Sequence, residues 1–442
     1  MTSKKQREPS DWSVELLAEY DERICELSRA RGLDWFPIQY EVCDYYSMIG
    51  HMSYSGMPTH YGHWSYGKAF ERTHQMYNLG MEGLPYELII NSDPSIAYLM
   101  KENPAYLQIL IMAHCVGHSD FFKNNRMFAK TRPETVIQRM RAAKKRIQAY
   151  SEDPHIGVEA VEDTLEACHA IQFQTYRHPR DREDHESIKQ RYIETINADK
   201  TGAWKDFDIT KIPLERDYDL LGFIAEHGDL DDWKVDVINI VREGAAYFMP
   251  QIQTKICNEG WASFIHYRTL HELELPQEYH IPFLKSHNQV LRPHIGGLNP
   301  YHVGFEIFKK IEERHGFEEC LIARENCNDA SLIRQYLKEE DARELGLFSF
   351  SKHRDEYRID EISDEDGWSE VKSALIRNVG CNGMPSIYVN KLEPSGALVL
   401  EHEHDGRDLE LKYADAVVDH VEELWEGPVK LFTMVEGEPW EI

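Results

Sequence analysis

The chain has 442 residues, of which 42% are hydrophobic, and its formal net charge is −28. The length suggests roughly two domains, and the composition suffices for a packed core, which excludes disorder throughout. The charge argues against nucleic acid as a partner, because phosphate would be repelled. The sequence contains no run of about 18 apolar residues that would predict a membrane span.

The first two-thirds of the chain predicts mainly helices. Residues 11–30 are amphipathic, as expected of a surface helix. The Gly-, Tyr- and His-rich segment 46–68 predicts an irregular loop that could line a pocket, and residues 86–92 predict a short buried strand. Asn103-Pro104 predicts a helix start, because Asn is a good N-cap and Pro suits the first helical position.

The remaining pattern predicts more helices and then a different fold class. Further helices are predicted at 133–151, 157–177, 231–248, 250–274 and 301–314, with a polar surface excursion at 178–215 and a loop at 276–300. After about residue 345, alternating apolar residues and an Asp405-Gly406 turn predict a hairpin, followed by a helix. We expect a mainly α protein, with a large helical domain over residues 1–344 and a small α+β domain over residues 345–442.

Two histidines stand four residues apart in "AHCVGHSDFF" (113–122), inside a predicted helix. Positions i and i+4 share one helix face, so His114 and His118 project side by side and can hold one divalent cation, with Zn²⁺ the first candidate. The alternative is two helical histidines bonded to neighbours. A third ligand would decide, because catalytic zinc sites use three protein ligands and leave one position open.

The best third ligand is Glu259 in "KICNEGWASFIHYRTL" (255–270). This segment is helical and largely apolar, where an unpaired carboxylate is costly. A structural salt bridge is the alternative. "HCVGH" followed by "NEGWA" resembles the helical gluzincin peptidases, in which HExGH supplies two histidines and a later EGWA-type helix supplies a glutamate. That resemblance implies metal ligands at His114, His118 and Glu259.

The resemblance to gluzincins fails at the residue after the first histidine. Their general-base glutamate would fall at Cys115. A thiol has an ordinary pKa of about 8.5 and near a metal would ionise or ligate instead. Cys115 is therefore either part of the site or a small buried hydrophobe. Other candidate bases, among which the sequence does not choose, are Asp120, Glu41, His63 and His266.

A second group of polar residues stands at a predicted helix start in "RPHIGGLNPYHVGF" (292–305). A helix N-terminus favours anions. We expect Tyr301, His302 or His266 to stabilise an oxyanion. The alternative is a loop that only packs and caps helices.

A different metal site is conceivable on the helix predicted at 157–177. Its acidic and histidine residues include an ExxH unit of the kind found in di-iron bundles, and they are Glu159, Glu162, Glu166 and His169. The sequence offers no convincing second unit, so an exposed acidic face is the simpler interpretation.

Nearly the whole chain resembles the SpoVR family (stage V sporulation protein R). The stretches that carry the resemblance are "YYSMIGHMSYSGMPTHYGHWSYGKAFE", "ELIINSDPSIAYLM", "AHCVGHSDFFKNN", "LLGFIAEHG", "IVREGAAYFMPQIQTKICNEGWASFIHY" and "RPHIGGLNPYHVGFEIF". The resemblance implies a link to spore cortex formation or to stress responses. It also implies work alongside a PrkA-type serine protein kinase and a von Willebrand-type protein.

Three functions follow as hypotheses, of which the third is a di-iron oxidoreductase-like bundle centred on Glu159, Glu162, Glu166 and His169. The first is a zinc-dependent amide or peptide hydrolase that acts on peptidoglycan-type peptides. The second is a regulatory or scaffold protein on a degenerate peptidase fold. The eight cysteines form no CxxC pair and the first residues lack the apolar core of a secretory signal, so we expect a cytoplasmic protein without structural disulfides.

Overall fold

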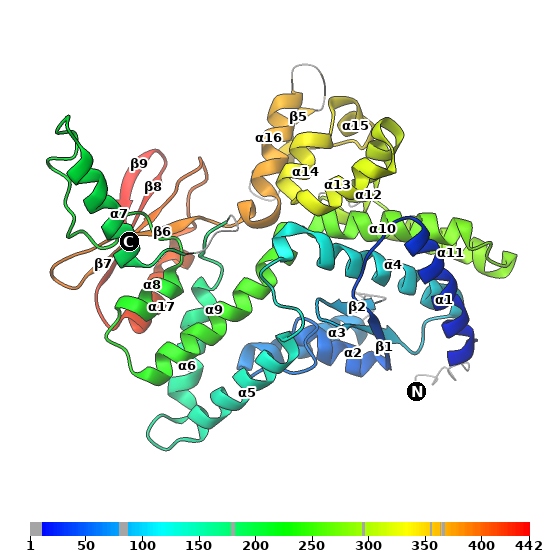
Figure 1. The fold of residues 1–442 in the computed structure, drawn as a ribbon, viewed down its shortest axis with the longest axis horizontal. Helices are drawn as coiled ribbons and strands as arrows, with labels where there is room; N and C mark the ends of the chain where they lie inside the picture. The colour runs from blue at the N-terminus through cyan, green and yellow to red at the C-terminus, as the bar shows by residue number, and fades with distance from the viewer. Residues whose placement is uncertain are drawn as a thin grey trace. The chain divides into compact units, whose positions relative to one another are not determined.

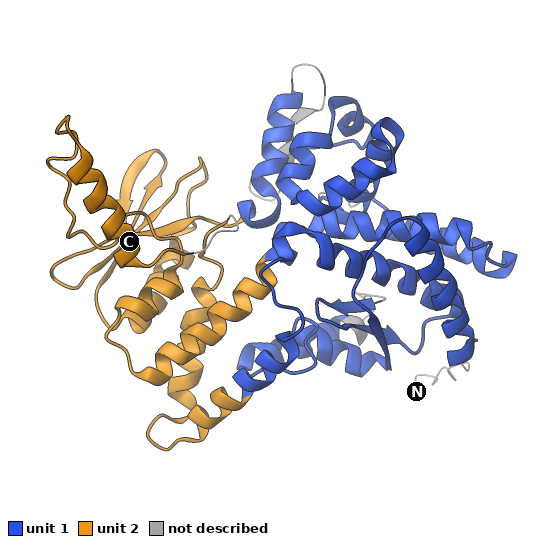
Figure 2. Cartoon of the chain, in the orientation of Figure 1, with its two compact units in different colours: residues 1–144, 250–383 blue, residues 145–249, 384–442 orange. Residues whose placement is uncertain are grey.

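The computed structural model describes residues 11–78, 87–177, 182–293, 297–353, 356–362, 364 and 367–442. The described chain is mainly helical and forms two compact units (Figure 2). Unit 1 consists of Met1–Lys144 and Pro250–Gly383, and unit 2 consists of Lys145–Met249 and Met384–Ile442. Residue 345, where we expected a boundary, lies inside unit 1.

Unit 1 contains most of the helices and a small mixed sheet (Figure 1). Its helices are α1 (Val14–Ala30), α2 (Tyr45–Ser53), α3 (Trp64–Asn78), α4 (Ala105–Asn124), α10 (Lys255–Glu272), α11 (Gln277–Val290), α12 (Pro300–His315), α13 (Phe317–Asn326), α14 (Asp329–Tyr336), α15 (Glu339–Glu344) and α16 (Trp368–Asn378), with 3-10 turns at Arg126–Phe128 and Gly380–Gly383. The sheet has the order β1 (Ile38–Cys43), β3 (Ser95–Met100) and β2 (Glu87–Ile90), with β1 parallel and β2 antiparallel to β3. A separate antiparallel pair joins β4 (Phe348–His353) to β5 (Glu356–Ile362).

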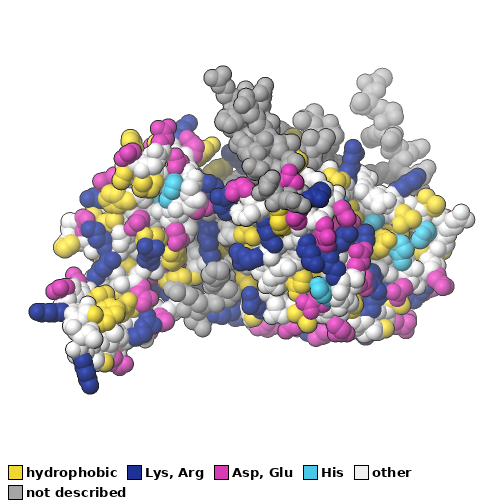
Figure 3. All heavy atoms as spheres, turned by 90° about the horizontal axis from the view of Figure 1, so that it is seen from above, with side chains coloured by type: hydrophobic (Ala, Val, Ile, Leu, Met, Phe, Trp, Pro, Cys, Tyr) yellow, Lys and Arg dark blue, Asp and Glu magenta, His cyan; other side chains and the backbone are white. Residues whose placement is uncertain are grey.

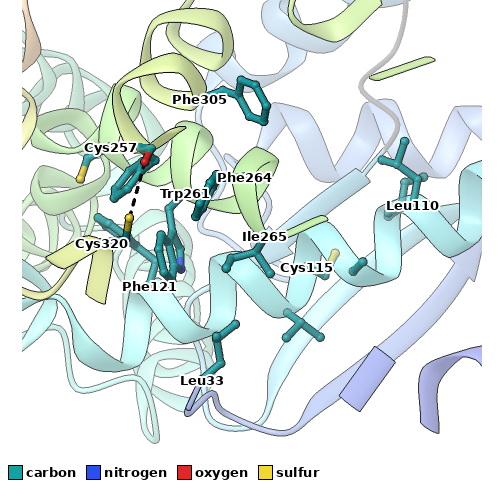
Figure 4. Packing of buried hydrophobic residues seen from close by; sticks show 14 of the residues in the cluster. Leu33, Leu110, Cys115, Phe121, Cys257, Trp261, Phe264, Ile265, Phe305 and Cys320 are labelled. Atoms are coloured by element: carbon teal, nitrogen blue, oxygen red, sulfur yellow. Dashed lines mark hydrogen bonds between the residues drawn. The ribbon is translucent and has the colours of Figure 1, made fainter. Parts of the chain in front are cut away.

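The core of unit 1 is built where α4, α10 and α12 pack at very short range. A Cβ atom on Gly117 of α4 would lie 2.8 Å from the Cα atom of Ala262 on α10. A Cβ atom on Gly304 of α12 would lie 2.2 Å from the carbonyl oxygen of Ile256 on α10. Figure 4 shows large apolar side chains of the same core, among them Trp261, Phe264 and Phe121. The glycines therefore let three helix backbones approach one another.

Unit 2 combines helices with a four-stranded sheet. Its helices are α5 (Val136–Glu152), which begins in unit 1, α6 (Gly157–Ile171), α7 (His185–Ala198), α8 (Leu220–His227), α9 (Asp232–Gln253), which ends in unit 1, and α17 (Leu411–Trp425). The strands lie in the order β6 (Ile387–Leu392), β7 (Leu398–His402), β8 (Val429–Val435) and β9 (Glu438–Glu441). Strands β7 and β8 are parallel, and α17 forms the crossover that such a pair requires.

Two local predictions were wrong. Segment 46–68 contains α2 and the start of α3, because the Asp44 side chain caps the Ser47 N–H at 2.8 Å and its aromatic residues tolerate a helix. Segment 276–300 contains α11 rather than a loop alone. The polar segment 178–215 lies at the surface as expected, and it contains α7, whose residues are all at least partly exposed.

The hairpin turn was misplaced as well. Asp405-Gly406 lies between β7 and α17 rather than between paired strands. The β6–β7 hairpin closes where the Glu393 N–H donates to the Ala397 carbonyl at 2.9 Å, with Gly396 at φ +89°. An Asp-Gly dipeptide marks a tight turn but does not fix which element follows it.

Charged side chains of both signs mix on the surface. Figure 3 shows Asp and Glu interspersed with Lys and Arg on the face it draws. In the described parts of the chain, we find no helix with the length and apolar character needed to cross a membrane.

Candidate metal centre

Helix α4 presents its two histidines on one face, one turn apart. The ring centroids of His114 and His118 lie 4.5 Å apart, and both residues are buried. Nearly every residue from 105 to 122 of α4 is buried, so this helix runs through the core of unit 1. Two imidazoles thus stand side by side in the interior of unit 1.

The Glu259 carboxylate from α10 faces both imidazoles. Its Oε2 atom lies 3.3 Å from His118 Nε2 and 3.7 Å from His114 Nε2. Its Oε1 atom accepts a hydrogen bond from Lys255 Nζ at 3.2 Å. The three residues expected as metal ligands therefore lie together, although the two motifs are far apart in sequence.

A second carboxylate at this place comes from the sheet. Glu87, the first residue of β2, has its Oε1 atom 3.5 Å from His114 Nε2. Glu87, His114 and His118 form a candidate metal-binding cluster, with one ligand atom from each lying within 4.8 Å of the others. Sequence reasoning missed Glu87, and its only sequence mark is a carboxylate beside the apolar run "LII".

The donor set suits a cation better than it suits mutual hydrogen bonding. Among the described residues, neither His114 Nε2 nor Glu259 Oε2 has a hydrogen-bond partner, and both atoms are buried. His118 Nδ1 lies 2.8 Å from Asn258 Oδ1, which can only accept, so Nδ1 carries a proton and Nε2 is the nitrogen that faces Glu259 and can bind a cation once it is unprotonated. Lone pairs that converge in a buried space are the arrangement that a divalent ion requires.

Burial and mutual charge set the protonation of these groups. Burial would raise the pKa of Glu259, but the imidazoles of His114 and His118 and the Lys255 ammonium outweigh it and hold that pKa well below its usual range. Burial would lower the pKa of His118, but Glu259 raises it overall. Burial also raises the pKa of Glu87. The centre thus holds one firmly ionised carboxylate.

Two further histidines lie behind His114. The Nδ1 atoms of His114 and His266 are 2.9 Å apart, and His266 Nε2 lies 2.7 Å from His287 Nδ1. Both ring nitrogens of His266 are therefore engaged, so this expected oxyanion donor does not point toward Glu259. His287, on α11, lies in the segment that we expected to be a loop, and it was missed for that reason.

Tyr301 belongs to the same site, whereas its neighbour His302 does not. The Tyr301 ring stacks 6.3 Å from that of His114, and the charge of Glu259 raises the Tyr301 pKa well above its usual value. Its hydroxyl therefore keeps its proton and can donate. His302 instead lines a pocket of about 480 Å³ with apolar neighbours such as Leu298 and Leu347.

Cys115 and Asp120 make other contacts than the imidazoles do. Cys115 is wholly buried among apolar side chains (Figure 4), and burial raises its thiol pKa well above the usual range. Asp120 accepts from Trp261 Nε1 at 2.9 Å and faces Arg324 at 3.4 Å, and burial raises its pKa to about 6. In the described residues, neither side chain bonds to His114, His118 or Glu259.

The remaining candidates also lie elsewhere. Glu41 is on β1, and His63 Nδ1 bonds Ser65 Oγ at 2.7 Å within a group of tyrosines and histidines. Helix α6, which carries the ExxH unit, is in unit 2, and its Glu159 is exposed. The described residues thus group metal-ligand side chains at Glu87, His114 and His118, not on α6.

Asp329, which sequence reasoning also missed, stabilises the helix that carries Glu259. Its Oδ1 atom accepts from the Cys257 N–H in the first turn of α10 at 2.9 Å. Asp329 is almost fully buried, and burial raises its pKa to about 7. The folded state therefore binds a proton that the unfolded state releases at a lower pH.

We expect Asp329→Asn to remove a pH dependence of stability. Because the folded-state pKa is the higher one, this contribution is present at low pH and is lost as pH rises toward and through about 7. Between pH 5 and pH 8 the wild type should lose about 2–3 kcal/mol that the variant does not lose. Thermal unfolding of both proteins at the two pH values measures this, and parallel pH profiles would refute it.

Comparisons with known proteins agree with the layout of the chain. Residues 11–384 match the family described as "SpoVR like protein", and residues 386–436 match the "SpoVR-like C-terminal domain". The chain is 31% identical over 472 residues to "Uncharacterized protein YcgB" of Escherichia coli (strain K12), covering 95% of this chain and 92% of that protein. No solved structure matches the chain, so the gluzincin likeness stays a prediction. Two family matches in sequence order and a relative aligned along nearly its full length place this chain in the SpoVR family.

Proposed function

We propose that this protein is a metal-dependent amide hydrolase whose centre holds one divalent cation, with Zn²⁺ the first candidate. His114, His118 and Glu259 would be its ligands, and Glu87 would add a further carboxylate. The observation that carries the proposal is the convergence of the two Nε2 atoms on Glu259 Oε2, with His114 Nε2 and Oε2 lacking hydrogen-bond partners among the described residues.

The residues around the cluster support chemistry on a carbonyl group. When bound, a divalent cation supplies Lewis acidity that polarises a carbonyl and acidifies water. The Tyr301 hydroxyl keeps its proton and can donate to an oxygen that gains negative charge. Asn258 holds the His118 ring in place, and the Lys255 ammonium fixes the second oxygen of Glu259.

The substrate class comes from the family rather than from the geometry. The family name links it to sporulation, which favours peptidoglycan-type stem peptides as substrates. For a protein in the cytoplasm these would be precursors or turnover fragments. Resemblance to the family likewise supports a PrkA-type serine protein kinase and a von Willebrand-type protein as partners.

A regulatory or scaffold function is the second candidate. The observation that favours it is Cys115, which stands where the resemblance to gluzincins would place a general-base glutamate and is wholly buried among apolar side chains. On this proposal the cation would stabilise the fold, and the protein would act by binding its partners.

A hydrolysis assay separates the two functions. The purified protein with Zn²⁺ should cleave stem peptides, seen by mass spectrometry as fragments that have gained one water molecule. Chelation or His118→Ala should abolish cleavage, whereas His302→Ala, in the neighbouring pocket, should retain it. A protein that binds Zn²⁺ but cleaves no stem peptide or simpler peptide amide would reject the hydrolase and favour the scaffold.

A further inference from the structure

Three buried histidines form a continuous hydrogen-bonded chain that leads away from the candidate metal centre. His114 Nδ1 contacts His266 Nδ1 at 2.9 Å, and His266 Nε2 contacts His287 Nδ1 at 2.7 Å. The three residues come from α4, α10 and α11, and each is at most 2% exposed. Each contact needs one donor and one acceptor, so the protons in the chain depend on one another.

Only one order of protons leaves His114 able to bind a cation. A ligating Nε2 must be unprotonated, so the His114 proton sits on Nδ1 and is donated to His266 Nδ1. His266 is then protonated on Nε2 and donates to His287 Nδ1. The reverse order, in which His287 donates inward, would place a proton on His114 Nε2 and block the site.

The surroundings of His287 indicate that the three hydrogen-bonded histidines do more than fill space in the core. Its ring is packed by Tyr267 at 4.8 Å and Phe305 at 5.2 Å. In such an aromatic setting an apolar side chain would fill the volume without burying two ring nitrogens, which cost free energy unless they are bonded. His287 does not touch His118, Glu259 or Glu87 in any contact that the structure describes.

We propose that His266 and His287 are positioning residues that hold His114 as the tautomer with a free Nε2, and so set the affinity and geometry of divalent-cation binding. This inference rests on the proposed function, because it presupposes that the centre binds a cation. Hydrogen bonds from a second layer of residues commonly fix the tautomer and orientation of ligating histidines, and losing one typically weakens metal binding about 10- to 100-fold.

The test compares two replacements of the distal residue. His287→Phe keeps an aromatic ring but removes the acceptor for His266 Nε2–H, whereas His287→Gln keeps an acceptor. We expect His287→Phe to weaken Co²⁺ and Zn²⁺ binding, measured by chelator competition, about 10- to 100-fold, and to change the visible spectrum of bound Co²⁺. His287→Gln should stay within a few-fold of wild type. The control is His315→Phe, an exposed histidine in the last turn of α12.

Other results would overturn the proposal in distinguishable ways. If the wild type binds Co²⁺ through His114 but His287→Phe leaves affinity and spectrum unchanged, the positioning role is wrong and the metal centre stands. Equal weakening by Phe and Gln would make His287 a packing residue. If the wild type binds no cation, the proposed function fails and this inference fails with it.

Should His287→Phe not fold, the wild type itself gives the answer. Histidine ¹⁵N shifts of the metal-free protein report which ring nitrogen carries the proton. A protonated Nδ1 on His114, together with a protonated Nε2 on His266, is the expected pattern. A proton on His114 Nε2 would overturn the proposal.

Discussion

Glu259→Gln is expected to leave a folded protein that no longer retains its metal. Elemental mass spectrometry of the wild type should find about one divalent cation per chain, as for a single site with three protein ligands. The glutamine is nearly isosteric but removes the one firmly ionised carboxylate, whose Oε2 faces both imidazoles at 3.3 and 3.7 Å. Metal content should fall to background, and His118→Ala should have the same effect.

The folded state of Glu259→Gln is a necessary part of this prediction. The low pKa of Glu259 means that its ionised form stabilises the folded state, so the near-isosteric glutamine should fold with a reduced free energy of unfolding, and circular dichroism must show the folded state before metal content is compared. The matched control is Glu272→Gln, a half-exposed carboxylate near the end of the same helix that pairs with Arg31. That variant should keep the metal.

Each alternative result identifies a different site. Metal that survives Glu259→Gln but is lost in Glu87→Gln would mean that Glu87, His114 and His118 hold the cation without α10. If none of these substitutions changes the metal content, the cation binds elsewhere in the protein. No stoichiometric metal in the wild type would remove the hydrolase proposal, and the scaffold function would then lead.

Sequence reasoning reached the part of the centre that depends on local geometry. A spacing of four residues on a helix places His114 beside His118 whatever surrounds them. The apolar surroundings of Glu259 in the sequence required a partner for its charge. Glu87 could not be found in this way. It reaches the imidazoles because β2 pairs with β3 beside α4, and that pairing is a tertiary fact with no local sequence mark.

The same distinction between local and tertiary effects explains the errors in the predicted fold. Helices α1 and α12 were predicted close to their observed bounds, and the start of α4 was predicted from Asn103-Pro104 to within two residues. Helix α2 is rich in Tyr, whose helix preference is weak, and α11 contains Pro282, which disfavours a helix interior, so tertiary packing must stabilise both. The two units each combine distant segments, and no composition change along the chain reveals such an arrangement.

A contact between helix backbones explains why glycines stand so close to the ligands, and Gly304→Ala is expected to disrupt it. In a helix this substitution normally stabilises by up to about 1 kcal/mol. At this position the new methyl would lie 2.2 Å from the Ile256 carbonyl oxygen and 2.7 Å from the Cα atom of Gly260, so α12 must move away from α10. We expect a loss of about 1–3 kcal/mol or more in the free energy of unfolding.

The site should register the same movement. Tyr301 lies one turn before Gly304 on α12, so a displaced α12 carries its hydroxyl away from Glu259. Gly67→Ala on α3, where a Cβ atom meets nothing within 4 Å, is the matched control and should be neutral or slightly stabilising. Thermal and urea unfolding of both variants measure the difference. If Gly304→Ala were as stable as Gly67→Ala, the close approach of α10 and α12 would not hold in solution, and the position of Tyr301 beside Glu259 could not depend on it.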